Sequence, residues 1–453
     1  MRVLSGLMFF PRGGSAHVAR ALAHELPAHG WDVTLLSGSL SGGGVGDATR
    51  FYAGLDVRAV DFRGGDAPMH PSYEDRPGAP DPVFAAVGDA EHERHVTAWA
   101  AALEQAGAAG FDVLHLHHLT PLHEAAARVA PEVPVVAHIH GTELLMLEHI
   151  ADGPPAAWEH AEAWAARMRR WARRAERLVL LSPSQLPRVE RLLGVGAERC
   201  VVSPNGFDPR IFAPREIDRA AHWREHLVAE PRGWRPGEPE GSVAYSEEQV
   251  EALHRGPVLL SVSRFTEVKR MGLLVRAFAR AQRMASTRAS LVLLGGHPGE
   301  WEGEHPWEAI AQSGARDVFL AGWHEHGTLP EFLQASDAIV LASVREQFGL
   351  VLVEGMACGV APVAVNRFGP AEIVEDGRTG WLVEPDDEAA LADALVDVVD
   401  DAHERERRGA LAREAALERY SWPALAGDLA GVLDDAARAG PQHADGIVEP
   451  VNY

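Results

Sequence analysis

The sequence predicts an α/β protein with two domains, each built on a parallel sheet. Its 453 residues are enough for two α/β domains of about 200 residues each. Short apolar runs alternate with helical stretches, which is the pattern of a parallel sheet covered by helices. In the C-terminal half these runs cover residues 290–294, 318–322 and 338–342. In the N-terminal half a glycine-rich turn follows the first apolar run.

The composition is that of a soluble globular protein, with 46% hydrophobic and 24% charged residues. A net charge of −23 argues against nucleic acid as a partner, because phosphate binding needs a basic surface. No apolar run approaches the roughly 20 residues that span a bilayer, so we expect no integral membrane segment. The N-terminus enters an apolar strand at Val3 without the layout of a signal peptide, which predicts a cytoplasmic protein. Cys200 and Cys358 are far apart in the sequence and indicate neither a disulfide framework nor a metal cluster.

Lysine usage is the most informative feature of the composition. Of the 42 basic residues, Lys269 is the only lysine, and every other one is arginine. Where a positive charge only solvates the surface, this chain uses arginine. A single lysine indicates a position that needs a compact ammonium group on a flexible stem. The alternative is a residue left over from compositional bias.

The N-terminal half begins with a predicted strand over residues 1–10 and a turn over 11–15. The turn contains Gly13 and Gly14, and Ser15 is the expected N-cap of a helix that ends near Gly30. A second strand is predicted over residues 31–36. Two long loops rich in Gly, Pro and Asp, at 38–46 and 63–83, are of a length that is usually functional or mobile.

Five histidines cluster at the ends of two predicted strands, 111–117 and 134–139. They are His115, His117, His118, His138 and His140. A zinc site is one interpretation, but the spacing gives no closed ligand set, and we expect no bound metal. Alternating histidines on a strand more often place one side chain in the core and the next in a cleft.

An arginine-rich helix is predicted over residues 157–177. Arg167, Arg170 and Arg174 recur at three- and four-residue spacing and form a charged stripe beside two tryptophans. Such a stripe could lie on an anionic membrane surface. We favour a solvated helix face, because the protein as a whole is strongly negative.

The stretch at 345–359, which reads REQFGLVLVEGMACG, carries the strongest functional signal. It follows the buried strand at 338–342, with a loop at 343–348 and a helix from Gly349 to a stop at Gly359. Glu346 lies in the loop and Glu354 in the second turn of the helix, with seven residues between them.

Between these two glutamates the chain presents free backbone N–H groups at the helix start. Those of Phe348, Gly349 and Leu350 form a predicted anion site. Carboxylates accept hydrogen bonds from paired sugar hydroxyls, so a carboxylate on each side of a phosphate site suits a nucleotide sugar. The alternative from the residues alone is an amphipathic helix with two solvated glutamates.

The segment EQFGLVLVEGMACG, with Pro362 and Val363 after it, resembles the paired-glutamate signature of the retaining family 4 glycosyltransferases. The match continues through GPAEIVEDGRTGWLVEP at 369–385, with one departure, Gly369-Pro370, where many members have two glycines. The resemblance implies the GT-B architecture, two Rossmann-like domains facing across a cleft. It places Glu346 near the donor sugar and assigns Glu354 to the ribose of the nucleotide.

The same resemblance assigns further residues. An arginine and a lysine five apart after a strand bind the donor pyrophosphate in the family, and here these are Arg264 and Lys269, so the only lysine falls on that position. His140 matches the histidine that contacts the donor sugar, and Trp323 lies where the base-binding loop falls. Gly13 and Gly14 match the N-terminal glycine pair.

The predicted domain boundaries follow from this alignment of features. Residues 1–208 form an acceptor-side Rossmann-like domain and 257–420 the nucleotide-sugar domain. Residues 209–256, a long polar stretch, form an interdomain linker or insertion, and could act as a lid or a dimer contact. Residues 421–453 form a final helix that crosses back to the first domain, and a tail.

The expected reaction is retaining transfer of a sugar from a UDP-sugar, or alternatively a GDP-sugar, to a small acceptor. Arg264, Lys269 and the helix start near Gly349 would stabilise the leaving diphosphate. The chain contains no Asp-x-Asp triplet, so the resemblance implies a metal-independent enzyme that needs no cofactor besides its donor substrate. A homodimer is left open.

Three alternatives stay open on the sequence. A nucleotide-sugar epimerase would share the architecture and need no acceptor. An NAD-dependent dehydrogenase is disfavoured, because no full G-x-G-x-x-G with a downstream acidic residue is found. A non-catalytic subunit that binds nucleotide sugars would keep the same binding residues.

Overall fold

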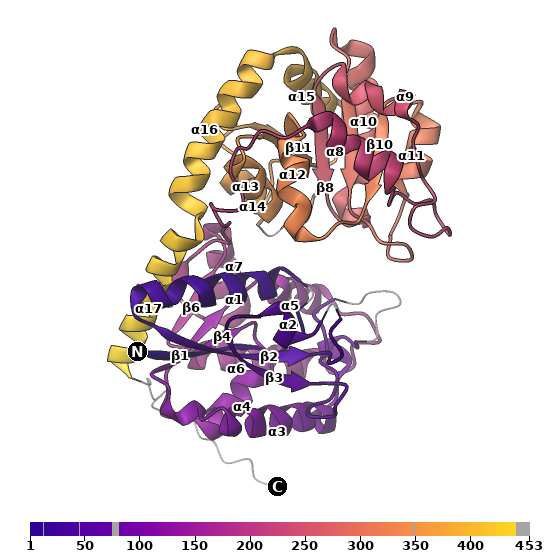
Figure 1. Ribbon diagram of the computed structural model, residues 1–453. Coiled ribbons are helices and arrows are strands. Elements are labelled where there is room, and N and C mark those ends of the chain that lie inside the picture. The colour runs from indigo at the N-terminus through magenta and orange to yellow at the C-terminus, as the bar shows by residue number, and fades with distance from the viewer. Residues whose placement is uncertain (12, 45, 75–80, 347, 441–453) are drawn as a thin grey trace. The chain divides into compact units, whose positions relative to one another are not determined.

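The computed structural model describes residues 1–11, 13–44, 46–74, 81–346 and 348–440. The chain divides into two compact units (Figure 1). The first contains Met1–Asn205 and the segment that begins at Trp422, and the second is Gly206–Ser421. Each unit contains a wholly parallel sheet with helices packed on it, so the predicted α/β class is confirmed.

The first unit contains a seven-stranded parallel sheet in the order β3-β2-β1-β4-β5-β6-β7. Its strands are β1 (Arg2–Leu7), β2 (Asp32–Ser39), β3 (Asp56–Asp61), β4 (Val113–His117), β5 (Val135–His138), β6 (Arg177–Leu180) and β7 (Cys200–Val202). The first strand ends three residues before its predicted end. β3 was not predicted, because as an edge strand it is mostly exposed and lacks an apolar run.

Helices cover both faces of this sheet. They are α1 (Gly14–Glu25), α2 (Ala48–Phe51), α3 (Asp89–Gln105), α4 (Leu122–Val129), α5 (Thr142–Asp152), α6 (Ala161–Arg174), α7 (Leu186–Leu193) and α17 (Trp422–Ala439). Val3 and Leu7 of β1 pack with α1 and α17, whereas Leu4 packs with α3 and α4 on the other face. The alternation along the strand therefore supplies two cores.

The turn after β1 differs in one detail from the prediction. Gly13 is the N-cap of α1, and Ser15, expected as the cap, is already inside the helix. Arg12 of the same turn lies outside the described residues. The helix passes into a 3-10 turn over Leu26–His29, and Gly30 ends it with φ of 84°, at the predicted stop.

The arginine stripe on α6 is engaged within the first unit. Arg167 pairs with Asp89, and Arg170 Nη2 lies 3.3 Å from Glu124 Oε2. Trp164 and Trp171 are buried in the core. Both tryptophans are thus unavailable to a membrane surface, and among the described residues no helix is long and apolar enough to cross one.

The second unit contains a six-stranded parallel sheet in the order β10-β9-β8-β11-β12-β13. The strands are β8 (Val258–Val262), β9 (Ser290–Leu294), β10 (Val318–Gly322), β11 (Ala338–Leu341), β12 (Ala361–Val365) and β13 (Trp381–Val383). The helices are α8 (Arg219–Arg224), α9 (Glu247–Val250), α10 (Met271–Met284), α11 (Pro306–Ser313), α12 (Leu329–Gln334), α13 (Leu350–Ala357), α14 (Gly369–Ile373), α15 (Glu388–Asp400) and α16 (Ala402–Tyr420).

The stretch 209–256, predicted as a linker or insertion, is part of the second unit rather than a free connection. Trp234 is buried in the core of that unit. The Tyr245 hydroxyl accepts a hydrogen bond of 2.7 Å from the backbone N–H of Leu320, at the end of the sheet. Gly233 pairs with Val243 in an isolated bridge. The stretch is folded against the β10 edge.

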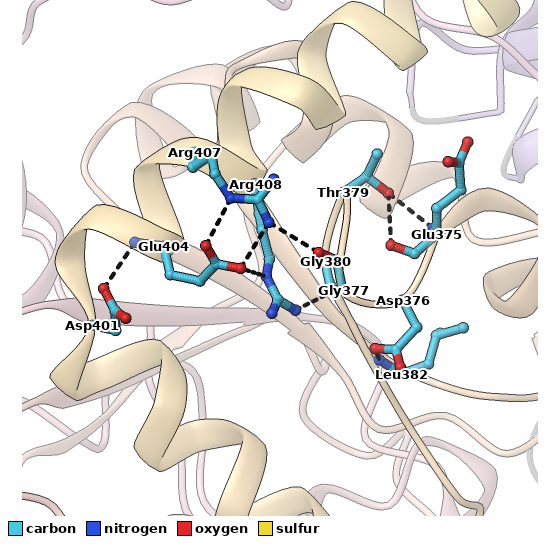
Figure 2. A network of polar contacts seen from close by, with 10 residues as sticks. All are labelled: Glu375, Asp376, Gly377, Thr379, Gly380, Leu382, Asp401, Glu404, Arg407 and Arg408. Atoms are coloured by element: carbon cyan, nitrogen blue, oxygen red, sulfur yellow. Dashed lines mark hydrogen bonds and ion pairs between the residues drawn. The ribbon is translucent and has the colours of Figure 1, made fainter.

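Helix α16 is anchored to the connection between α14 and β13 by a polar network (Figure 2). Arg407 and Arg408 donate hydrogen bonds of 2.9 and 2.7 Å to the carbonyl oxygens of Gly377 and Gly380. Glu404 accepts from both guanidinium groups, and these hydrogen bonds lower its pKa to about 2. The network orients the helix along the second unit.

Helix α17 packs in the first unit beside α1 (Figure 1). Leu425, Leu429 and Leu433 are buried in the core that α1 also lines. The Trp31 indole donates a hydrogen bond of 3.1 Å to Asp434. The C-terminal helix thus supplies an apolar face that the first sheet needs, and residues 441–453 of the predicted tail lie outside the described part.

We expect Leu433→Ala to lower the free energy of unfolding by about 2–5 kcal/mol, because it leaves a cavity in the first core. Leu417→Ala on α16 is the matched control, since Leu417 is 37% exposed and Leu433 is fully buried. The control should stay within about 0.5 kcal/mol of the parent. Urea unfolding followed by circular dichroism measures both, and equal losses would show that α17 does not contribute to this core.

Candidate functional site

The carboxyl ends of two neighbouring strands position most of the predicted site residues. β8 and β11 lie side by side in the second sheet and run parallel, so the loops that follow them emerge at the same edge. Arg264 and Lys269 lie between β8 and α10. Glu346, Phe348 and Gly349 lie between β11 and α13.

Backbone contacts hold these two loops together. The Val268 carbonyl accepts a hydrogen bond of 3.0 Å from the N–H of Val344 and one of 3.4 Å from the hydroxyl of Ser343. A short 3-10 turn over Glu267–Lys269 ends at Arg270, which has φ of 54°, before α10 begins. The position of Lys269 is therefore set by backbone geometry as well as by its side chain.

The only lysine of the chain pairs with the first glutamate of the signature. Lys269 Nζ contacts Glu346 Oε2, and both side chains are mostly buried. An ammonium group in such a place keeps donors for a second anion, because it has three N–H groups. The structure thus brings together two residues that the sequence places 77 positions apart.

Arg264 lies at the same sheet edge but is exposed. Among the described residues its guanidinium has no hydrogen-bond or ion-pair partner. A planar fork with free donors suits a phosphate group.

The start of α13 has the geometry of an anion site. Gly349 is the N-cap with φ of 97°, a conformation that favours glycine. The backbone N–H groups of Phe348, Gly349 and Leu350 donate no hydrogen bond to another described residue. Gln347, inside the signature, lies outside the described residues. The free N–H groups and the helix dipole both favour negative charge here.

Gly369, at the departure from the family pattern, is required by close packing. A Cβ atom at this position would lie 2.3 Å from the Cα and carbonyl oxygen of Phe348. Pro370 occupies the first turn of α14, where its missing N–H costs nothing. The proline therefore leaves intact the close backbone contact between Gly369 and Phe348, in the loop before α13.

Glu354 has a partner that the sequence analysis missed. Its carboxylate is almost completely buried in α13, and His326 Nε2 lies 2.6 Å from its Oε1. His326 begins the 3-10 turn His326–Thr328 after β10, so this contact joins the β10 loop to α13. One histidine among 23 with no motif around it gave no signal in the sequence.

Trp323 lies directly after β10 in the same loop and is 41% exposed, which is unusual for so large an apolar side chain. Its carbonyl oxygen accepts a hydrogen bond of 3.5 Å from Arg232 of the 209–256 stretch. An exposed indole at this sheet edge is available to stack on a planar ring. Its assignment to the nucleobase stays a prediction.

In the first unit, His140 lies between β5 and α5, and Gly13 and Gly14 lie at the start of α1. Space beside both glycines is open, since a Cβ there would meet no atom within 4 Å. His140 Nε2 is 3.0 Å from His117 Nδ1. The roles of these three residues toward a donor stay predictions.

The histidine cluster is more buried than the alternation along the strands predicted. His115, His117, His118 and His138 are all buried, so the prediction that every second one faces a cleft was wrong. The reason is that strands in a parallel sheet are covered on both faces. The cluster is also hydrogen-bonded internally, for example His115 Nε2 to His138 Nδ1 at 3.3 Å.

Burial determines the charge state of this cluster. It lowers the pKa of His115 to about 4 and the pKa values of His117, His138 and His140 well below the usual range. These imidazoles are therefore neutral at pH 7. Burial would raise the pKa of Glu143, but the electrostatic interaction and the 2.7 Å hydrogen bond with His118 outweigh this and lower it.

Two family models match the chain. "Glycosyltransferase Family 4" matches residues 12–211, and "Glycosyl transferases group 1" matches residues 246–415. The chain is 30% identical to a D-inositol 3-phosphate glycosyltransferase of Stackebrandtia nassauensis over 72% of this chain and 68% of that protein. It is 25% identical to an N-acetyl-alpha-D-glucosaminyl L-malate synthase of Bacillus anthracis over 68% of this chain and 71% of that protein.

Solved structures show the same fold. A sucrose-phosphate synthase of Thermosynechococcus elongatus superposes with a TM-score of 0.67 at 18% identity, covering 97% of this chain and 100% of that one. A HepE protein of Anabaena in complex with UDP and glucose also gives 0.67, at 19% identity, covering 95% and 99%. The GT-B architecture expected from the sequence is thus confirmed.

We expect Glu354→Gln and Glu346→Gln to fail differently. Glu354, held by His326, should bind ribose in the ground state and the transition state alike, so its loss raises the KM for the donor and leaves kcat largely intact. Glu346, paired with Lys269, should act on the sugar as its bond to phosphate breaks, so its loss lowers kcat.

Calorimetry with a free nucleoside diphosphate separates these roles, because that ligand has ribose and phosphates but no sugar. Glu354→Gln should weaken its binding and Glu346→Gln should leave it almost unchanged. His326→Gln should resemble a mild form of Glu354→Gln. Equal loss of diphosphate binding and equal loss of kcat in both glutamate variants would refute this division.

Proposed function

Because the chain belongs to the group 1 glycosyltransferases, which transfer a sugar from a nucleotide sugar, we propose that it moves a hexose from a UDP-sugar to a small polar acceptor with retention of configuration. The observation that carries the proposal is the position of Lys269. The only lysine of the chain lies in the loop after β8, in contact with Glu346 and beside the start of α13.

The reaction needs positive charge where the diphosphate leaves. As the bond between the anomeric carbon and the phosphate oxygen breaks, negative charge grows on that oxygen. Lys269, the exposed guanidinium of Arg264 and the N–H groups at the start of α13 are arranged at one sheet edge to stabilise it. Stabilisation of this kind acts on the transition state more than on the ground state, which raises turnover.

Retention in this proposal follows a front-face displacement. The acceptor oxygen attacks from the side on which the diphosphate leaves, and the leaving phosphate oxygen takes the acceptor proton. No separate carboxylate nucleophile is then required. The chain has no Asp-x-Asp triplet, and we propose that the protein's own cations replace a metal at the leaving group.

Known relatives support the choice of donor and acceptor. The HepE protein of Anabaena was solved with UDP-glucose, and its likeness to this chain covers the fold. The names of two relatives contain D-inositol 3-phosphate and L-malate, which are small and polar. The two names favour a small hydroxylated acceptor, and the HepE title favours a UDP-sugar. A polymeric acceptor is the alternative, because another relative, 28% identical over 72% of this chain, is a glycogen synthase of Mycobacterium tuberculosis.

A nucleotide-sugar epimerase is the second candidate, and a binding subunit without activity is the third. Both would use the residues that bind the diphosphate. Breaking the bond to the diphosphate needs Lys269 to stabilise the negative charge that grows on the leaving oxygen, whereas binding alone does not, so variants of this residue distinguish catalysis from binding.

We expect Lys269→Ala and Arg264→Ala each to lower kcat on the order of 100-fold or more, since each removes a charge that stabilises the leaving diphosphate. Lys269→Arg should also be impaired, because a planar guanidinium does not fit the place of a compact ammonium. Initial rates of nucleoside diphosphate release with a UDP-sugar and an acceptor measure the effect.

Arg280→Ala is the matched control, because Arg280 is an exposed arginine on α10, after the β8 loop. Its turnover should match the parent, and circular dichroism should show all four variants folded. A Lys269→Ala variant with the turnover of the control would refute the assignment.

A further inference from the structure

Three side chains of the kinds that bind metal ions lie close together in the second unit, outside the loops that carry Lys269 and Glu346. His222 lies on α8, His226 on the following helical turn Glu225–Ala229, and Glu331 on α12. One ligand atom from each lies within 4.8 Å of the other two. The group joins the 209–256 stretch to the helix that follows the β10 loop.

None of the three side chains has a hydrogen bond or an ion pair with another described residue. His222 is 7% exposed, and its Nε2 atom is buried without a hydrogen-bond partner. His226 and Glu331 have no side-chain hydrogen bond or ion pair with another described residue. A buried imidazole nitrogen without a partner costs free energy, which a bound ion would recover.

Local helix geometry favours a shared ligand. His222 and His226 are four residues apart, so they lie on one face of a helix. The turn that carries His226 is a π-helix, a rare element that is frequent at functional sites. Burial lowers the pKa of His222 to about 3 and also lowers that of His226, so both are neutral ligands at pH 7.

The histidine cluster of the first unit provides the contrast. His115, His117 and His138 also lie close enough to share an ion. Both ring nitrogens of His117 are hydrogen-bonded, to Ser5 and to His140, and His115 Nε2 is bonded to His138 Nδ1, although His138 Nε2 is buried without a partner. A metal held by His117 would have to replace one of these two hydrogen bonds, whereas the site on α8 and α12 needs no such exchange.

We propose that His222, His226 and Glu331 bind one divalent transition-metal ion, with Zn²⁺ the best match to two imidazoles and a carboxylate. A tetrahedral ion with bonds of about 2.1 Å needs ligand atoms about 3.4 Å apart, so the side chains close in on binding. Glu331 is exposed and His226 half-buried, which leaves both free to rotate.

A bound metal ion would hold two segments of the second unit together. His226 packs against His324, with ring centroids 4.8 Å apart, and all three histidines of this region pack on Phe332 of α12. His324 follows Trp323 in the β10 loop. A metal at this site therefore fixes the 209–256 stretch against the loop that presents Trp323 and His326, without touching the groups that stabilise the diphosphate.

The test is zinc titration of the full chain after dialysis against EDTA. Isothermal calorimetry should give one equivalent, and zinc at about 100 times its Kd should raise the melting temperature by roughly 5 °C. His226→Gln and Glu331→Gln should each weaken binding by more than the roughly 10- to 100-fold that loss of an outer partner causes. Co²⁺ in place of zinc gives a visible spectrum that reports imidazole coordination.

His254→Gln, an exposed histidine of the same unit, is the matched control and should bind zinc like the parent. His138→Gln changes the histidine cluster of the first unit and should also bind one equivalent of zinc. Removing zinc should lower the melting temperature and leave turnover at 25 °C within about twofold, which separates this site from the proposed chemistry. The proposal would be overturned if the parent bound no zinc. It would also be overturned if His226→Gln bound zinc as tightly as the parent, or if His138→Gln no longer bound it.

Discussion

The contact between Lys269 and Glu346 joins the two loops on which the proposed chemistry depends. It is possible because β8 and β11 are neighbours in a parallel sheet, so their carboxyl ends meet at one edge. The Val268 carbonyl, which accepts from Val344 and Ser343, fixes the same junction through the backbone. The remaining parts of the site, Arg264, the start of α13 and the His326–Glu354 pair, are positioned by the same sheet edge.

Charge explains why such a junction is needed. With a net charge of −23, the protein as a whole repels a nucleotide sugar, and binding must rely on local positive groups. Lys269 is neutralised in part by Glu346, which lowers the cost of keeping an ammonium group mostly buried. A diphosphate would share that ammonium, and Arg264 and the helix N–H groups would add donors that no other residue in the described part of the chain engages.

Much of this was readable in the sequence, because the relevant signals are local. The glutamate pair, Gly349 and the lone lysine stand out within short segments, and the alternation of apolar runs indicates a parallel sheet. His326 and the group around His222 were missed, because each depends on contacts between distant segments, and the edge strand β3 was missed because it is mostly exposed and lacks an apolar run. The burial of every strand histidine shows where tertiary packing outweighed local preference, and the helix that follows β1 begins after Gly13 instead of Ser15. The 209–256 stretch looked like a linker, since its few buried residues, such as Trp234, are scattered along a polar sequence.

The most direct test of the central claim is an assay of the purified protein with a panel of UDP-, GDP-, ADP- and TDP-sugars and small polyol acceptors. Phosphorus magnetic resonance follows the nucleotide, and proton magnetic resonance follows the anomeric configuration. We expect a nucleoside diphosphate to appear only when donor and acceptor are both present, with the product linkage in the configuration of the donor. Conversion of the nucleotide sugar to its epimer without release of diphosphate would contradict the account, as would a product of inverted configuration.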